Sequence, residues 1–207
     1  MKALVKLANQ HDFYIIEDDI YGELRFRSEL CPPIKSVCDE GRVILCGSFS
    51  KCLSRELRIG WIAGGLLHHK IVQLKLITQL ASPQAVQEGL AEFISQGHFK
   101  RYVNQHRQQL KEQRDQLLAE LKKHWGTQIK FTKPNGGLSC WVELPDHIDT
   151  QQSYKALLEK GIVLTPGVLF SAHGLYKNHM RLSFSQPLTE RRRAALHLLF
   201  QTLLTDQ

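Results

Sequence analysis

Three short runs of continuous apolar residues constrain the fold of this chain more than any other feature of its sequence. They lie at residues 13–16, 43–46 and 59–63. A strand that is apolar at every position, instead of at alternate positions, is typical of a sheet that is covered on both faces. We therefore expect an α/β fold in which helices lie on both sides of these strands.

The chain begins with a helical pattern that leads directly into the first strand. Residues 2–10 carry apolar side chains at helical spacing, and residues 13–16 follow after a short polar break. A buried strand of this kind needs parallel neighbours, and no earlier strand is present to supply them. We therefore expect the chain to be the C-terminal portion of a larger domain whose first part precedes Met1.

The rest of the chain reads as a helical stretch followed by a smaller mixed region. After Gly64 and Gly65 the pattern is helical to about residue 95, with Pro83 opening a helix, and a charge-rich helix follows at 99–125. We predict a first domain at 1–98, a bridging helix at 99–125 and a small α+β domain at 126–207. In the small domain, strands are expected at 129–132, 138–144, 163–165 and 180–184, and helices at 153–160 and 189–204, with Thr189 as N-cap.

Composition excludes several classes of protein. The 207 residues are 43% hydrophobic and 23% charged, as in ordinary globular proteins. No run approaches the ~20 apolar residues that span a bilayer, so we expect no membrane partner. Because polar residues precede the first apolar run, we expect no signal peptide. Five cysteines without a C-x-x-C pair favour free thiols and a cytoplasmic location.

The net charge of +7 raises the question of nucleic-acid binding. Basic residues are concentrated at 100–123 and 191–193, and in the first stretch they alternate with Glu112, Asp115 and Glu120. This alternation is more typical of a solvated helix face than of a phosphate-binding track. We therefore expect that this segment binds no nucleic acid itself, whereas an anionic small molecule is compatible with the charge.

Acidic residues follow the first apolar strand directly. They are Glu17, Asp18 and Asp19, and Tyr21 comes two residues later. Ligands of α/β sheets bind beyond the carboxyl ends of the strands, so Asp18 and Tyr21 are candidate site residues. An acidic turn with a solvated tyrosine is the alternative, and these residues alone favour it.

A second cluster, Ser48, Ser50 and Lys51, follows the second strand. A partly desolvated lysine offers the neutral amine that forms an imine with a carbonyl group. Only six residues separate Lys51 from Arg58, too few for a parallel crossover, so the strand after Arg58 should run antiparallel. Arg58 then returns to the edge that holds Ser48, where a hydroxyl and a guanidinium suit a phosphate monoester. The 32 residues between Asp18 and Lys51 allow a parallel connection, which brings both to one end of the sheet.

Several strings of residues together resemble one protein family. They are IIEDDIYGEL, GRVILCGSFSK, LRIGWIAGG, PNGGLSCWVELP, TPGVLF and the RLSF that begins at Arg181. Over nearly its whole length the chain resembles the fold-type I aminotransferases of class I and II, which depend on pyridoxal 5'-phosphate (PLP). It is most similar to the aminotransferase-like domain of MocR-type GntR regulators and to kynurenine/2-aminoadipate aminotransferases. The resemblance implies that 1–98 is part of a cofactor-binding large domain.

The resemblance also implies the cofactor, PLP, and a role for each candidate residue. Lys51 would form the Schiff base with the cofactor and then move a proton as a base. Asp18 would keep the pyridine nitrogen protonated, and Tyr21 would hydrogen-bond the 3' oxygen. The phosphate would be held by Ser48 and Arg58, with Ser50 as a weaker candidate.

Substrate and partners are implied in the same way. Arg181 would bind the substrate α-carboxylate, and the reaction would transfer an amino group between an amino acid and a 2-oxo acid. Members of the family are usually homodimers. The alternative function is a PLP- or amino-acid-sensing effector domain of a MocR/GntR-type transcriptional regulator, in which an N-terminal winged-helix domain outside this segment binds DNA. A third interpretation is a truncated product that has no activity alone. The sequence leaves these interpretations open.

Two features depart from the family pattern. Arg55 and Glu56 stand where relatives often carry Pro-Gly, so the loop between Lys51 and Arg58 is expected to differ in conformation. The segments that supply the Gly-rich phosphate loop, the stacked aromatic and the asparagine near the 3' oxygen in relatives precede residue 1.

Histidines give no sign of a metal centre in the sequence. None of the ten belongs to an H-E-x-x-H motif or to a similar ligand-like pairing. We therefore expect no metal site.

Overall fold

The chain folds into two compact units, Met1–Arg107 and Gln108–Gln207. The structure is a computed structural model, and it describes residues 1–26, 32–38 and 41–205. The sequence-based division into 1–98, 99–125 and 126–207 stays a prediction. The family fold itself is confirmed below by the solved structures that the chain matches.

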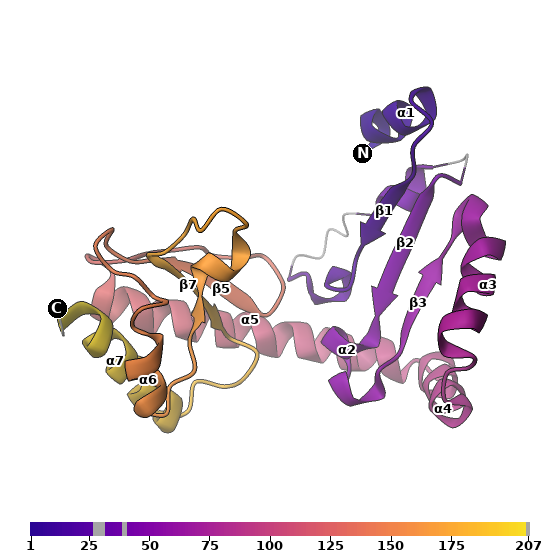
Figure 1. The fold of residues 1–207 in the computed structure, drawn as a ribbon. Helices are drawn as coiled ribbons and strands as arrows, with labels where there is room; N and C mark the ends of the chain where they lie inside the picture. The colour runs from indigo at the N-terminus through magenta and orange to yellow at the C-terminus, as the bar shows by residue number, and fades with distance from the viewer. Residues whose placement is uncertain (27–31, 39–40, 206–207) are drawn as a thin grey trace. The chain divides into compact units, whose positions relative to one another are not determined.

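A three-stranded sheet organises the first unit, in the order β1-β2-β3 (Figure 1). β1 (Ile15–Asp18) pairs in parallel with β2 (Val43–Ser48), and β3 (Gly60–Ala63) pairs with β2 in the antiparallel direction. Both directions confirm the argument from connection length. The parallel neighbour of β1 therefore lies downstream in the chain, at β2.

Burial in this sheet is concentrated on the central strand. Val43 and Ile44 point to opposite faces of β2, and both are buried. On the outer strands, Ile16 is 73% exposed and Ile62 is 50% exposed. The expectation of a sheet covered on both faces thus holds for β2, while the described elements of this unit leave parts of β1 and β3 open.

Helices make up most of the rest of the first unit. α1 buries Val5 and Ala8 on its apolar face, whereas α3 has no buried residue. Pro83 stands directly before α4, as expected, and Gly97 adopts a φ of +75° between α4 and α5, where a side chain would be strained. The helices are α1 (Lys2–Gln10), α2 (Phe49–Cys52), α3 (His68–Gln79), α4 (Gln84–Ser95) and α5 (His98–Trp125), with short 3₁₀ turns at Gly22–Leu24, Ile34–Val37, Arg55–Leu57 and Gly65–Leu67.

The second unit contains a fully antiparallel sheet in the order β4-β5-β7-β6. The strand predicted at 163–165 is shorter and begins only at Thr165, and Val163 lies before it in an irregular segment, 74% exposed. The other strands and helices lie within about two residues of their predicted positions. They are β4 (Lys130–Phe131), β5 (Ser139–Glu143), α6 (Tyr154–Glu159), β6 (Thr165–Pro166), a 3₁₀ turn (Gly167–Phe170), β7 (His179–Ser183) and α7 (Glu190–Thr205).

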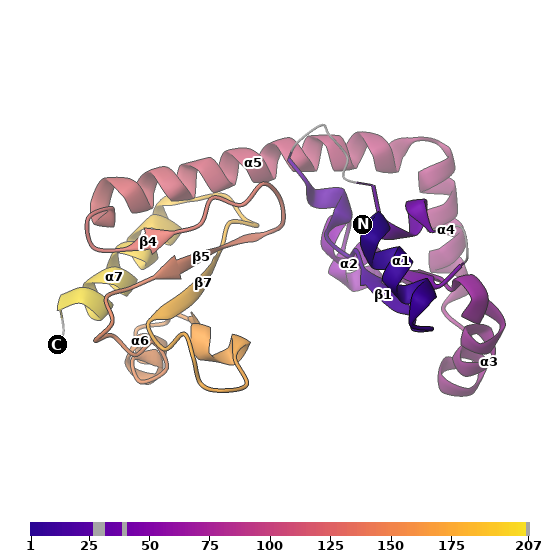
Figure 2. The ribbon, with the colours of Figure 1, turned by 90° about the horizontal axis from the view of Figure 1, so that it is seen from above.

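The second half of α5 packs against α7, and Figure 2 shows both helices beside the sheet. The Trp125 and Phe200 rings stack with their centroids 4.3 Å apart. Thr189 caps α7 as predicted, because its hydroxyl accepts a hydrogen bond from the backbone N–H of Arg192 at 3.4 Å. The largest fully buried side chains of this unit are Leu110, Leu121, Val142, Ile148, Leu157, Met180, Phe184, Phe200 and Leu203.

Cysteines in the described part of the chain are free thiols: Cys38, Cys46, Cys52 and Cys140. Cys31 lies outside the described residues. Burial raises the pKa of the Cys140 thiol to about 11, so this group stays protonated at neutral pH and is a poor nucleophile.

None of the helices within residues 1–26, 32–38 and 41–205 combines the length and the apolar character that crossing a membrane requires.

Replacing Gly65 by alanine tests the turn that precedes α3. Gly65 has a φ of +56°, and an added Cβ would lie 2.1 Å from the carbonyl oxygen of Gly41. We expect Gly65→Ala to lower the free energy of unfolding by about 2 kcal/mol or more, measured by urea denaturation. Gly89→Ala is the matched control, because Gly89 lies within α4 with no atom within 4 Å of the added Cβ. That variant should be more stable than the parent by up to about 1 kcal/mol, and equal stability of the two variants would contradict the turn.

Candidate active site

Strand register brings the sequence-predicted residues of the first unit to one end of the sheet. Asp18, the last residue of β1, is opposite Cys46, and Ser48, the last residue of β2, is opposite Gly60. Lys51 follows Ser48 by three residues, and Arg58 precedes Gly60 by two. Both therefore lie at the end of the sheet where β1 and β2 terminate.

Ser48 fixes the turn that carries Lys51. Its hydroxyl oxygen accepts a hydrogen bond from the backbone N–H of Ser50 at 3.1 Å, which makes Ser48 the N-cap of α2. The same hydroxyl lies 3.5 Å from the carbonyl oxygen of Ile59, and the Phe49 N–H donates to that carbonyl at 3.1 Å. These bonds tie the start of α2 to the residue that follows Arg58.

Two glycines let the second and third strands approach closely at this point. An added Cβ on Gly60 would lie 2.8 Å from the carbonyl oxygen of Gly47. An added Cβ on Gly47 would lie 2.4 Å from the indole of Trp61. Side chains at either position would separate the strands that carry Ser48 and Arg58.

Arg58 adopts a left-handed backbone conformation, with φ of +52° and ψ of 32°. Such a conformation is costly for a residue with a Cβ, by about 1–2 kcal/mol, and glycine or asparagine would be easier there. Residues of this kind concentrate at functional sites. The side chain of Arg58 is exposed and has no hydrogen-bond or ion-pair partner among the described residues.

The loop between Lys51 and Arg58 contains a short 3₁₀ turn. Ser54 caps it by accepting a hydrogen bond from the backbone N–H of Glu56 at 3.3 Å. The side chains of Arg55 and Glu56 form an exposed ion pair at 2.9 Å. Arg55 and Glu56 thus lie in an ordinary capped turn, and Arg58 is the residue that ends it.

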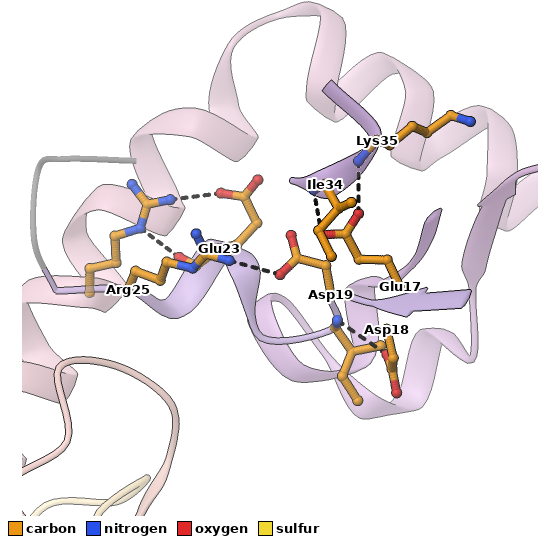
Figure 3. A network of polar contacts seen from close by, with 9 residues as sticks. Glu17, Asp18, Asp19, Glu23, Arg25, Ile34 and Lys35 are labelled. Atoms are coloured by element: carbon orange, nitrogen blue, oxygen red, sulfur yellow. Dashed lines mark hydrogen bonds and ion pairs between the residues drawn. The ribbon is translucent and has the colours of Figure 1, made fainter. Parts of the chain in front are cut away.

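Asp18 differs from its acidic neighbours because they have structural partners (Figure 3). Glu17 accepts hydrogen bonds from the backbone N–H groups of Ile34 and Lys35, and Asp19 pairs with Arg25 at 3.1 Å. Glu23 pairs with Arg107 at 2.7 Å. Asp18 accepts only a long bond of 3.4 Å from the N–H of Ile20, so of these four carboxylates it is the most open to a ligand.

The remaining candidates of the first unit also present open polar groups. Lys51 and Tyr21 are exposed, and neither side chain has a polar partner within the described parts of the chain. The Ser50 hydroxyl is likewise unpartnered there, whereas the Ser48 hydroxyl is used in the cap. Ser50 is thus a stronger candidate for a ligand contact than the sequence indicates.

Arg181 lies in the other unit, near the middle of β7. It is opposite Trp141 of β5 and Thr165 of β6, and its guanidinium lies 5.4 Å from the centroid of the Phe170 ring. Arg181 is exposed, so its charge is available to an anion at this face of the second unit.

The open groups of the first unit match the chemistry of PLP. A carboxylate suits a protonated ring nitrogen, a phenol suits the ring oxygen, and a primary amine suits the aldehyde. The free guanidinium of Arg58 and the hydroxyl of Ser50 suit the phosphate. Every polar function of the cofactor therefore has a complementary group among these residues.

Comparisons with known proteins identify the family of the chain. The family model described as "Aminotransferase class I and II" matches residues 1–198. The aromatic-amino-acid aminotransferase 1 of Thermococcus litoralis is 37% identical, over 98% of this chain and 49% of its own length. The HTH-type transcriptional regulator YjiR of Escherichia coli is 34% identical, over 94% of this chain and 42% of its own length.

Solved structures give the same result. The α-aminoadipate aminotransferase LysN from Thermus thermophilus, complexed with N-(5'-phosphopyridoxyl)-L-leucine, matches with a TM-score of 0.78 and 28% identity, over 98% of this chain and 52% of that chain. The chain thus spans about half the length of the relatives it matches. The family and this complex indicate PLP as the cofactor. The match over residues 1–198 shows that the chain belongs to the aminotransferase class I and II family.

Proposed function

We propose that this chain provides the Lys51 side of the active site of a PLP-dependent aminotransferase, which transfers an amino group between an amino acid and a 2-oxo acid. The observation that carries the proposal is the convergence of Asp18, Ser48, Lys51 and Arg58 on one end of the sheet. When bound, PLP withdraws electrons from the substrate Cα, which makes the proton on that carbon easier to remove.

Different residues of the first unit bind different groups of the cofactor. The carboxylate of Asp18 holds the proton on the pyridine nitrogen, and the Tyr21 hydroxyl donates a hydrogen bond to the 3' oxygen. Arg58 and Ser50 bind the phosphate, and Ser48 holds the turn between them and can contribute its hydroxyl. The lack of other partners for Asp18, Ser50 and Arg58 among the described residues supports these roles.

Lys51 carries the reactive amine. It binds the cofactor covalently and then, once free, takes the proton from the substrate Cα. Its position in the capped turn after Ser48 supports this role, because the cap holds the backbone that presents the side chain. In the second unit, the exposed guanidinium of Arg181 binds the substrate α-carboxylate.

A regulator's effector domain is the second candidate. It is favoured by relatives described as HTH-type transcriptional regulators, of which YjiR covers nearly the whole chain. In this function the same residues bind PLP or an amino acid, and occupancy is communicated to a DNA-binding domain. The two functions share the Lys51 site and differ in whether amino transfer is completed.

We further propose that the protein acts as a homodimer whose interface includes α3. Its apolar side chains Val72, Leu76 and Ile77 are exposed, by 51%, 61% and 78%. Leu80, which follows the last residue of this helix, is 79% exposed with a φ of +57°. Apolar groups clustered in this way are typical of a surface that is covered by another chain.

Covalent trapping tests the role of Lys51. PLP is added to the protein as expressed, with any residues beyond these 207 retained, and the product is reduced with borohydride. We expect a stable adduct on the peptide that contains Lys51, which is absent in Lys51→Ala and retained in the control Lys70→Ala. Persistence of the same adduct in Lys51→Ala would contradict the assignment.

Amino transfer, followed as 2-oxo acid produced, should fall in Lys51→Ala by a factor on the order of 10²–10⁴. If the adduct forms but no amino acid is converted, the effector function replaces the enzymatic one.

Two substitutions of Arg58 separate binding from folding. Arg58→Ala and Arg58→Gly should both weaken PLP binding by about 1.5–3 kcal/mol, the contribution of a hydrogen bond to a charged group. Because glycine tolerates the left-handed backbone, Arg58→Gly should leave the free energy of unfolding unchanged or raise it by up to about 1 kcal/mol. Absorbance titration measures the first effect and urea denaturation the second. Unchanged PLP affinity in both variants would remove Arg58 from the phosphate site.

The state of association tests the proposed interface. We expect the parent protein to sediment as a dimer and Ile77→Glu to sediment as a monomer at micromolar concentration, because a buried unpaired carboxylate opposes association. Gln79→Glu places the same charge on the same helix, away from Ile77, and should remain a dimer. A monomeric parent, or a dimer in both variants, would exclude α3 from an interface.

A further inference from the structure

A buried carboxylate surrounded by basic side chains lies between α5 and α7 in the second unit. The side chain of Glu120 is only 8% exposed. Its Oε1 lies 3.1 Å from Nε2 of His197 and 3.5 Å from Nε2 of His124, one helical turn further along α5. Its other oxygen, Oε2, pairs with Nη1 of Arg193.

We propose that Glu120, His124 and His197 bind a divalent transition-metal ion of the Zn²⁺ type. One ligand atom from each residue lies within 4.8 Å of the other two. Zn–N and Zn–O bonds of about 2.1 Å hold ligand atoms about 3.3 Å apart in a tetrahedron. The two separations from Oε1, 3.1 Å and 3.5 Å, are close to this value, and the two histidine nitrogens lie within 4.8 Å of each other.

The orientation of the histidines favours a shared ion over ordinary hydrogen bonds. Both rings direct Nε2 at the same carboxylate oxygen, and their centroids lie only 4.5 Å apart. A single ion bound by both Nε2 atoms and by Oε1 would give the two imidazoles and the carboxylate one common partner.

Arg193 acts on the far side of the carboxylate. By holding Oε2, it orients Glu120 so that Oε1 remains free to face the histidines, as groups behind metal ligands commonly do. The charge of Arg193 is partly offset by Glu190, which lies 3.6 Å away. The arginine therefore fixes the ligand without occupying the position of the ion.

The site is open to solvent on the side of the imidazoles. The side chains of His124 and His197 are 32% and 42% exposed. His197 also lines a hollow of about 260 Å³ together with Trp125, Gln128 and Gln201. An ion can enter from this side, and a water molecule can complete a four-coordinate sphere.

The expectation of no metal site came from sequence motifs, and this cluster has none. In the sequence, Glu120 and His124 have the spacing of an ordinary pair of side chains four residues apart on a helix. His197 belongs to another helix much further along the chain. Only the packing of α7 on α5 brings the third group to the pair.

Titration of the full chain with Zn²⁺ alone tests the proposal. By calorimetry we expect one ion per chain, with an affinity that falls roughly tenfold or more in His124→Gln and in His197→Gln. His147→Gln is the matched control, because His147 is an exposed histidine of the same unit outside the cluster, and its affinity should equal that of the parent. The absence of stoichiometric binding, or equal affinity in all variants, would overturn the proposal.

Two further measurements control for binding of the ion by cysteine and for variants that do not fold. Co²⁺ in place of Zn²⁺ should give a tetrahedral visible spectrum without the charge-transfer band of a thiolate ligand, and such a band would assign the ion to cysteine instead. If either variant fails to fold, as judged by circular dichroism, the parent protein decides: Zn²⁺ should shift the imidazole NMR signals of His124 and His197. Signals that stay unchanged while other histidines respond would refute the site.

Discussion

The hydrogen-bonded turn at Ser48 holds together the part of the structure on which the candidate site depends. Ser48 ends β2, pairs with Gly60 of β3 and caps the short helix α2. The side chain of Ser48 thus links the central strand β2, the turn that carries Lys51 and the segment that leads from Arg58 into β3. Without this link, the start of α2 and the residue after Arg58 would lose the bonds that hold them side by side.

Much of this arrangement could be predicted from the sequence because loop length limits strand direction. Six residues between Lys51 and Arg58 force an antiparallel return, and 32 residues between Asp18 and Lys51 permit a parallel one. Apolar periodicity and caps such as Thr189 likewise located the long helices. Connection lengths, apolar periodicity and caps each depend on residues that are close together in the chain. They can therefore be recognised in a single sequence.

Other features depend on partners far along the chain and could not be predicted. The partners of the acidic residues near Asp18 are an example, because Glu17 and Glu23 are held by groups as distant as Ile34 and Arg107. The left-handed backbone of Arg58 could not be predicted either, because arginine as a residue type favours right-handed helical conformations. The cluster around Glu120 depends on helix packing in the same way.

The backbone conformation at position 58 affects which residue types can be kept there during evolution. A residue with a Cβ in a left-handed conformation lowers stability, so selection for folding alone favours glycine or asparagine there. Under the proposed phosphate-binding role of Arg58, an arginine persists at this position only while its side chain is needed. The residue at this position in related chains would then distinguish proteins that bind the phosphate from those that keep only the fold.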